Sequence, residues 1–247
     1  MGYRNIVYEK KERVGHVTLD RPDAGNSLDR AMAEELARCC RSINEDDGVW
    51  VVVITGSGKT FSEGDQRIDA ELAGIASSAI ASLKSPVIGA INGDALGSGL
   101  EIALACDIRL AAEGAKFGFP ETSRGAIPTG GGTQRLPRIV GKGKALELIL
   151  TSAVIDAQEA LRIGLVNRVV PVSELHKEVQ ALALKLASKG PISERYAKEA
   201  INKGMDMSLG QGLRLEADLS FLLQSTKDRE EGIKAFLDKR TPQFRGE

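Results

Sequence analysis

Runs of apolar side chains predict short strands separated by helices in the first half of the chain. Residues 14–19 alternate apolar and polar positions, which is typical of a half-buried strand. Residues 50–54 form a continuous, largely β-branched run, which indicates a strand buried on both faces. Residues 87–91 and 108–111 are further predicted strands. Because helical patterns, including an amphipathic stretch over 28–43 that follows Ser27, separate the strands, we expect an α/β fold.

After about residue 140 the apolar spacing becomes mostly helical, and only residues 165–170 are typical of a strand. The predicted helices cover residues 144–150, 157–163, 172–188, 193–203, 209–223 and 228–236. Because a proline can begin a new helix, Gly190–Pro191 is the expected boundary. We therefore divide the chain into a core, residues 1–190, and a C-terminal helical region, residues 191–247, expected to pack on the core or on a neighbouring subunit.

Composition narrows the possible functions. The chain has 247 residues, and 42% of them are hydrophobic, enough for a core in one large domain. The 33 basic and 34 acidic residues give a net charge of −1, which argues against nucleic-acid binding. No apolar run is long enough for a membrane span, and the first residues do not form a signal peptide.

Cysteines and histidines suggest no metal or triad chemistry. Cys39, Cys40 and Cys106 have no metal-ligand spacing, and an odd, unpatterned count is typical of a reducing compartment. We therefore expect a cytoplasmic protein. His16 lies in a predicted strand and His176 in a charged helix, and neither is near another motif, so we interpret both as structural or surface residues.

Glu101 stands at a glycine-rich turn. Residues 92–107 (NGDALGSGLEIALACD) place this turn between a buried strand and an apolar helix, predicted over residues 100–105. Unpaired N–H groups at a helix start, with the positive end of the dipole behind them, can stabilise negative charge on oxygen. The segment lacks the P-loop ending and the full dinucleotide signature. The structural alternative for Glu101 is a carboxylate favoured by the helix dipole.

Glu121 stands in a second cluster, residues 117–136 (FGFPETSRGAIPTGGGTQRL), where prolines stiffen a loop and three glycines open another helix. Its structural alternative is an ion pair with Arg124 or Arg135. A third cluster, residues 55–65 (TGSGKTFSEGD), follows a predicted strand, and its amides could face a cleft at the strand ends. Its structural alternative is an ordinary connection.

Together the three clusters resemble the crotonase (enoyl-CoA hydratase/isomerase) superfamily in order, residue types and spacing, over nearly the whole chain. The motifs that carry the resemblance are LDRP at 19–22, NSL at 26–28, NGDALG at 92–97, IP at 127–128, GGTQRL at 131–136 and DREEG at 228–232. The resemblance implies a crotonase-like spiral of repeated β-β-α units with a C-terminal helical region.

The resemblance further implies an enzyme that acts on acyl-CoA thioesters with no metal or redox cofactor. The family holds the thioester oxygen with two backbone N–H groups, which correspond by position to those of Asp65 (or Gly64) and Ser98. In family hydratases two glutamates hold a water, one acting as base and the other giving a proton to the α-carbon, and Glu101 and Glu121 match them. We therefore expect reversible hydration of a 2-enoyl-CoA or dienoyl-CoA.

The substrate contacts implied by the resemblance lie in three places. The loop at residues 21–28 corresponds to the family segment that contacts the adenine and pantetheine portions of CoA, with Ala24 and Asn26 as candidates. Gly97 is also assigned to substrate binding, and Thr129 stands next to the presumed water site.

Some positions depart from the family pattern. Where many relatives have AGAD, this chain has EGDQ at 63–66, so Asp65 brings a carboxylate near the developing charge. Ser98 and Thr129 stand where glycine is frequent. Residues 66–85, which border the acyl pocket in relatives, form a shorter stretch, and the acyl group stays open among straight, branched and cyclic chains.

Two alternatives to the hydratase remain. One is a double-bond isomerase that uses a single glutamate, and the other is a non-catalytic acyl-CoA-binding member. The family also implies a homotrimer or a homohexamer. From the near-neutral charge and the absence of a long apolar run, we expect neither nucleic acid nor membrane as partner.

Overall fold

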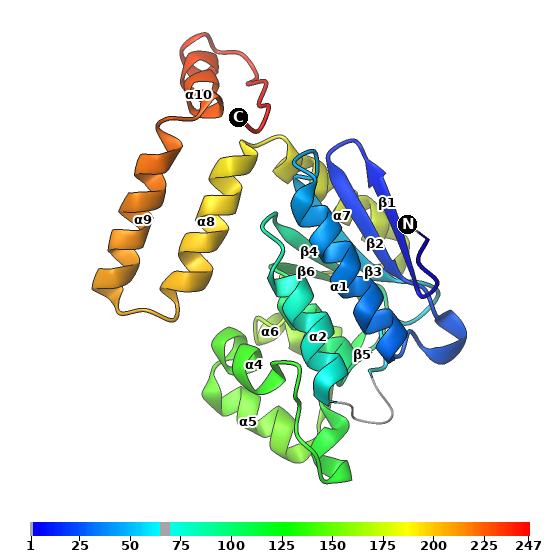
Figure 1. The fold of residues 1–247 in the computed structure, drawn as a ribbon. Coiled ribbons are helices and arrows are strands. Elements are labelled where there is room, and N and C mark those ends of the chain that lie inside the picture. Colours follow the sequence, from blue (N-terminus) through cyan, green and yellow to red (C-terminus); the bar gives the residue numbers. More distant parts are fainter. Residues whose placement is uncertain (1, 65–69) are drawn as a thin grey trace.

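The computed structural model describes residues 2–64 and 70–247, which fold into a layered α/β core with helices extending from it (Figure 1). The larger sheet has the strand order β1-β2-β3-β4-β6-β9. Its strands are β1 (Ile6–Lys11), β2 (Val14–Leu19), β3 (Val51–Gly56), β4 (Val87–Ile91), β6 (Ile108–Ala112) and β9 (Arg168–Val170). β1 pairs antiparallel with β2, and the other neighbours are parallel. The expected α/β class is therefore confirmed.

Helices cover both faces of this sheet. Val52 and Ile54 of β3 face the cluster that contains α1 (Arg30–Glu45) and α2 (Ala70–Ala81). Val51 and Val53 face α7 (Val172–Ala187). Alternate residues of one strand thus enter two apolar layers, as the continuous run over 50–54 predicts.

The start of α1 differs from the prediction. The helix begins at Arg30, after Asp29, whose carboxylate accepts the N–H of Met32 at 2.8 Å, rather than directly after Ser27. An aspartate in this position satisfies one of the N–H groups that lack a partner within the helix. The amphipathic face is buried as expected, with Met32, Leu36 and Ile43 against the sheet.

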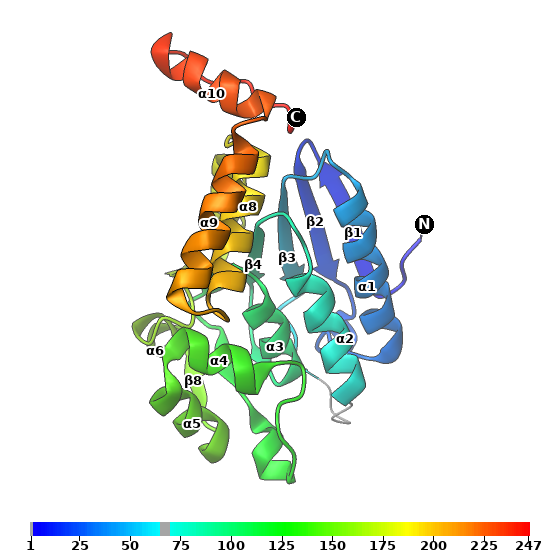
Figure 2. The same ribbon diagram turned by 60° about the vertical axis from the view of Figure 1, so that its left-hand side comes forward.

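A smaller sheet has the order β5-β7-β8. Its strands are β5 (Ala95–Leu96), β7 (Lys116–Gly118) and β8 (Val154–Asp156). The surrounding helices are α3 (Ser98–Ala105), α4 (Gly132–Val140), α5 (Lys142–Thr151) and α6 (Ala157–Arg162) (Figure 2). The 3-10 helices η1 (Pro22–Ala24) and η2 (Pro120–Arg124) complete the loops around the strand ends.

The C-terminal helices extend away from the core (Figures 1 and 2). They are α8 (Pro191–Gly204), α9 (Leu209–Leu223) and α10 (Lys227–Leu237). Because α7 ends at Ala187 and α8 begins at Pro191, the predicted helix boundary is confirmed, while the division into two domains stays a prediction. In residues 2–64 and 70–247, no helix is long and apolar enough to cross a membrane.

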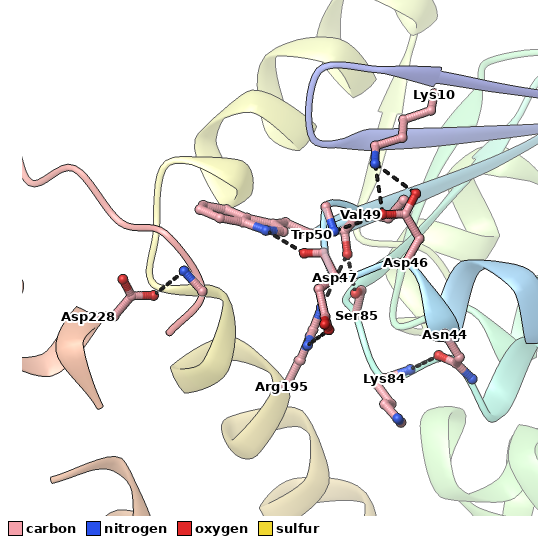
Figure 3. A network of polar contacts seen from close by, with 12 residues as sticks. Lys10, Asn44, Asp46, Asp47, Val49, Trp50, Lys84, Ser85, Arg195 and Asp228 are labelled. Atoms are coloured by element: carbon pink, nitrogen blue, oxygen red, sulfur yellow. Dashed lines mark hydrogen bonds and ion pairs between the residues drawn. The ribbon is translucent and has the colours of Figure 1, made fainter. Parts of the chain in front are cut away.

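Polar contacts attach α8 to the start of the strands. Figure 3 shows Arg195 pointing towards Asp47 and Val49, and its guanidinium lies 3.6 Å from the Asp47 carboxylate. One turn later, Lys198 Nζ lies 2.6 Å from Asp107 Oδ2 and donates to Ser85 O at 3.0 Å. Only 11% of the Lys198 side chain is exposed, so this anchor is largely shielded from solvent.

Candidate active site

The carboxylate of Glu101 is held inside the protein. Every residue of α3 is buried, and Glu101 is 1% exposed. Its Oε1 accepts the N–H groups of Gly130 and Gly132 at 2.7 and 2.8 Å. Two N–H groups separated by one residue, with Gly131 in the left-handed region (φ 105°), form a backbone concavity that suits an anion. Glu101 is therefore more than a carboxylate placed at a helix start.

Glu121 approaches the same place from η2 and is 8% exposed. Its Oε1 lies 2.7 Å from the position that a Cβ would occupy on Gly97, the residue before α3. Among the described residues, Glu121 Oε2 has no hydrogen-bond partner, and neither has Ser98 Oγ. Buried polar atoms normally have hydrogen-bond partners. The contacts among the described residues therefore do not explain why these two oxygens are buried here.

The two glutamates meet because β5 and β7 are neighbours. β5 leads into α3 and Glu101, and β7 leads into η2 and Glu121. The strands are parallel, with Leu96 opposite Gly118, and the N–H of Gly97 donates to Gly118 O at 3.0 Å. Parallel strands end at the same edge, so the segments that follow them emerge side by side. The small sheet is thus what brings the two carboxylates together.

Burial dominates the electrostatics of the pair. It raises the pKa of Glu101 to about 7, against the lowering effect of the N–H groups of Gly132 and Gly130, and the charge of Glu121 adds to the rise. Burial also raises the pKa of Glu121. Acids and bases that work near neutral pH need pKa values in this range. Arg135 acts through its charge on Glu101 rather than on Glu121. Arg124 lowers the pKa of Glu121 through its charge, but no ion pair joins the two side chains among the described residues.

The turn after β3 packs against the start of α3. A Cβ on Gly64 would lie 3.0 Å from Ser98 N and 2.5 Å from Leu96 O. The N–H of Ser98 belongs to the first turn of α3, where N–H groups have no partner within the helix. The N–H of Gly64 donates to Ser62 Oγ at 3.3 Å, so it is engaged within its own turn. Asp65, the other predicted donor, lies outside the described residues.

A cavity of about 910 Å³ adjoins this turn. It is lined by Ala24 and the rest of the η1 loop, by Glu63, which precedes Gly64, and by Leu72 of α2. The residue after Leu72, Ala73, has its carbonyl 2.7 Å from the position of a Cβ on Gly130. One wall of the cavity thus belongs to the same turn of α2 that contacts Gly130, although neither Glu101 nor Glu121 is among the residues that line the cavity.

Asn26, predicted to contact substrate, has a different position from Ala24. It is fully buried, and its Nδ2 donates to Ser57 O and Thr60 O at 2.9 and 2.8 Å. Its Oδ1 accepts the N–H of Arg21 at 2.9 Å. All polar atoms of this side chain are thus engaged with backbone, and Asn26 holds together the loops that line the cavity rather than presenting its amide to a ligand.

Thr129 is exposed and lies next to Gly130. Two residues that we did not assign to the site from sequence, Ser77 of α2 and Arg135 of α4, contact the neighbouring turn. Ser77 Oγ and Arg135 Nη1 both lie within hydrogen-bond distance of Gly130 O. Arg135 belongs to the GGTQRL motif and lies one turn into α4, so the sequence contains a signal for its role at the site. Ser77 belongs to no motif, and the sequence contains no such signal for it. Among the described residues, no His, Cys, Asp and Glu side chains gather in a way that could hold a metal ion.

Comparison with known proteins agrees with this arrangement. The sequence profile of enoyl-CoA hydratase/isomerase matches residues 9–247. The chain belongs to the enoyl-CoA hydratase/isomerase family. A crotonyl-CoA hydratase of Syntrophomonas wolfei is 42% identical, with 99% of both chains covered. A probable enoyl-CoA hydratase of Mycobacterium bovis is 40% identical at the same coverage.

Solved structures of the family have the same fold. The enoyl-CoA hydratase of Bacillus anthracis superposes with a TM-score of 0.96 at 43% identity, covering 99% of this chain and 100% of the other. Pseudomonas aeruginosa DspI superposes with a TM-score of 0.95 at 36% identity, covering 99% and 98%. The crotonase-like fold expected from the motifs is therefore confirmed. The family is one of enzymes, and the hydratases named among the relatives are carbon–oxygen lyases.

Proposed function

We propose that the protein adds water reversibly to the double bond of a 2-enoyl-CoA or dienoyl-CoA thioester, with Glu101 and Glu121 as its acid–base pair. The observation that carries the proposal is the convergence of two buried carboxylates from α3 and η2, one held by two backbone N–H groups and one with a free, buried oxygen. The names of the relatives support the same reaction class.

The contacts of each carboxylate suggest its role in hydration. Glu101 accepts two N–H groups, which favour its charged form, so it is the base that takes a proton from water. Burial favours the neutral form of both carboxyls, but among the described residues Glu121 accepts no such pair of N–H groups, so it is the acid that gives its proton to the α-carbon. The water oxygen then bonds to the β-carbon, and the two glutamates end with exchanged protonation states. Dehydration reverses each transfer.

Backbone donors are proposed to stabilise the enolate. The N–H of Ser98 is one, and the N–H of Asp65 is the other, because that of Gly64 is engaged by Ser62. Donors fixed in this way are typically worth about 10²–10³ each in rate. Gly97 and Thr129 are proposed to border the thioester and water positions. The cavity beside Ala24 suits the extended part of an acyl-CoA, and its volume is in the usual range for ligand sites.

Loss of the ultraviolet absorbance of crotonyl-CoA tests the reaction directly. We expect turnover by the wild type, with no metal or cofactor added, and a loss of at least about 10² in Glu101→Gln and in Glu121→Gln. Glu35→Gln is the matched control, since Glu35 is buried on α1 and binds the N–H groups of Arg4 and Asn5. It should keep normal turnover. Near-normal rates in either active-site variant would refute the assignment.

The same variants separate the alternatives. An isomerase would create the conjugated band from a 3-enoyl-CoA and would depend on only one of the glutamates. A non-catalytic member would bind the thioester without changing its absorbance. Equal losses in both glutamine variants for hydration of crotonyl-CoA favour the hydratase over each of them.

We also propose that residues 191–247 mediate assembly into a homotrimer or homohexamer. Four apolar side chains on α9 and α10 are strongly exposed in the single chain: Leu209 (79%), Phe221 (71%), Phe236 (83%) and Leu237 (72%). Exposed apolar surface of this kind marks contacts with other chains. Light scattering of the purified protein distinguishes a monomer from either assembly.

A further inference from the structure

The turn formed by Gly130–Gly132 holds Glu101 from one side and is itself held from the other. Its N–H groups at Gly130 and Gly132 point to Glu101 Oε1, while the carbonyl of Gly130, between them, is directed to two side chains. Arg135 Nη1 donates to this carbonyl at 2.7 Å, and Ser77 Oγ lies close enough to donate as well. The geometry of the anion-binding turn therefore depends on contacts outside it.

Glycine makes these outside contacts necessary. A Cβ on Gly130 would lie 2.6 Å from Glu101 Oε2, and Gly131 has φ 105°, so residues with side chains do not suit the turn. Three successive glycines restrain the backbone least of all residues. Ser77 has one hydroxyl hydrogen, and it is shared between the carbonyls of Gly130 and Ala73. The hydrogen bond from Arg135 Nη1 to Gly130 O is not shared in this way.

We infer that Arg135, supported by Ser77, is a positioning residue that fixes the Gly130–Gly132 turn on the carboxylate of Glu101. The inference deepens the proposed hydratase and rests on it for its effect on rate. Arg135 acts in two ways, through the hydrogen bond to Gly130 O and through its positive charge. That charge favours the ionised form of Glu101, the form in which Glu101 takes a proton from water.

Few other charges act on Glu101. The elements packed against α3 are α2, β5 and α4. Residues 72–81 of α2 and both residues of β5 are uncharged. α4 carries Arg135 and Arg138, and Arg138 is turned outwards to Gln134 O and Asp206. From η2, Glu121 opposes the ionisation of Glu101. Among the described residues of these elements, Arg135 is thus the cation that offsets burial and the charge of Glu121.

The test compares the pH dependence of kcat/KM for hydration of crotonyl-CoA in the wild type, Arg135→Met, Arg135→Lys and Arg138→Met. In Arg135→Met we expect the acid limb of the kcat/KM profile to move to higher pH by about one unit. At pH values below the limb, kcat/KM should fall about tenfold. Arg135→Lys keeps the charge, so its limb should stay near that of the wild type while kcat falls. Arg138 lies three residues along the same helix and is 51% exposed, so Arg138→Met should leave both the acid limb and kcat unchanged.

A second readout needs no turnover. Infrared difference titration follows the carboxyl band that is absent from Glu101→Gln, and in Arg135→Met this band should titrate at higher pH than in the wild type. If crotonyl-CoA is not hydrated but the band moves, the proposed function fails and the positioning role stands. An unmoved band in an active enzyme overturns the positioning role alone, as does an equal shift in Arg138→Met. If Arg135→Met does not fold, Arg135→Gln, which keeps a donor but not the charge, replaces it in both measurements.

Discussion

Glu121 Oε1 lies 2.7 Å from the place where a Cβ on Gly97 would stand. The residue before α3 and the acid on η2 are therefore in direct contact, although they are far apart in sequence. Gly97 also has φ 52° and ψ −126°, a conformation that residues with a Cβ rarely adopt. Both the space that Glu121 occupies and the backbone conformation at the start of α3 therefore require a glycine at position 97.

Gly97→Ala should therefore damage both the site and the fold. We expect the free energy of unfolding to fall by about 1–3 kcal/mol because of backbone strain. We expect kcat/KM to fall by at least about 10², because Glu121 must move away from the added methyl group. Gly74→Ala is the control: Gly74 lies inside α2, with no atom within 4 Å of an added Cβ. Chemical denaturation and crotonyl-CoA turnover measure both effects, and normal turnover in Gly97→Ala would contradict the contact.

Gly130→Ala tests the other acid. The new Cβ would lie 2.6 Å from Glu101 Oε2 and 2.7 Å from Ala73 O, so either the carboxylate or α2 must shift. A displacement of this size is expected to cost about 10² in kcat/KM. Gly143→Ala, in α5 with open space around it, should have wild-type rates. A Gly130→Ala enzyme as active as Gly143→Ala would show that the turn does not hold Glu101.

Glu194 should make stability depend on pH. Burial raises the pKa of Glu194, at the start of α8, to about 7, and its Oε2 has no partner among the described residues. The folded protein then binds more protons than the unfolded chain between about pH 4.5 and 7. The free energy of unfolding should therefore fall as pH rises through this window, with Glu101 contributing in the same direction.

Glu194→Gln should reduce that fall by about 1 kcal/mol, a figure that allows for the partial solvent access of the side chain. Urea denaturation at pH 5 and pH 8 gives the two free energies. Glu216→Gln, at an exposed position on α9, serves as control. The same pH dependence in the wild type and in Glu194→Gln would exclude a contribution from Glu194.

The anchor of α8 should matter more for stability than an exposed ion pair of the same helix. Lys198→Met removes the ion-pair partner of Asp107, whose side chain is 25% exposed and still accepts the N–H of Val87, and we expect a loss of about 1–3 kcal/mol. Lys203→Met removes an exposed pair with Glu199 and should cost less than about 0.5 kcal/mol. Thermal unfolding compares the stabilities of the two variants. A larger loss of stability in Lys203→Met than in Lys198→Met would contradict the role of Lys198 as the anchor of α8.

The sequence predicts the large sheet well where strands are apolar. β4 has the bounds predicted for it, because its five residues form an uninterrupted apolar run. β1 was missed, since its sequence IVYEKK is mostly exposed and only Ile6 is buried. An edge strand of this kind lacks the alternation on which the prediction depends. β5 and β7 have two and three residues, too few for any periodicity.

The site shows a similar division. The motifs identify Glu101 and Glu121 as candidates, but their convergence depends on the pairing of β5 with β7, which local patterns do not reveal. Asn26 illustrates the opposite case. A polar residue in a binding loop can contact a ligand or hold the loop together, and only the bonds from its Nδ2 to Ser57 and Thr60 distinguish these roles.

The small sheet also separates two properties that evolution can alter independently. Both acids follow strands of this sheet, whereas the cavity wall near Leu72 comes from α2 and from the loops around η1. Insertions, deletions or substitutions in that wall change the shape of the cavity without changing the spacing of β5 and β7. A lineage with this fold can therefore change the shape of its binding cavity while the two proposed acids keep their relative positions.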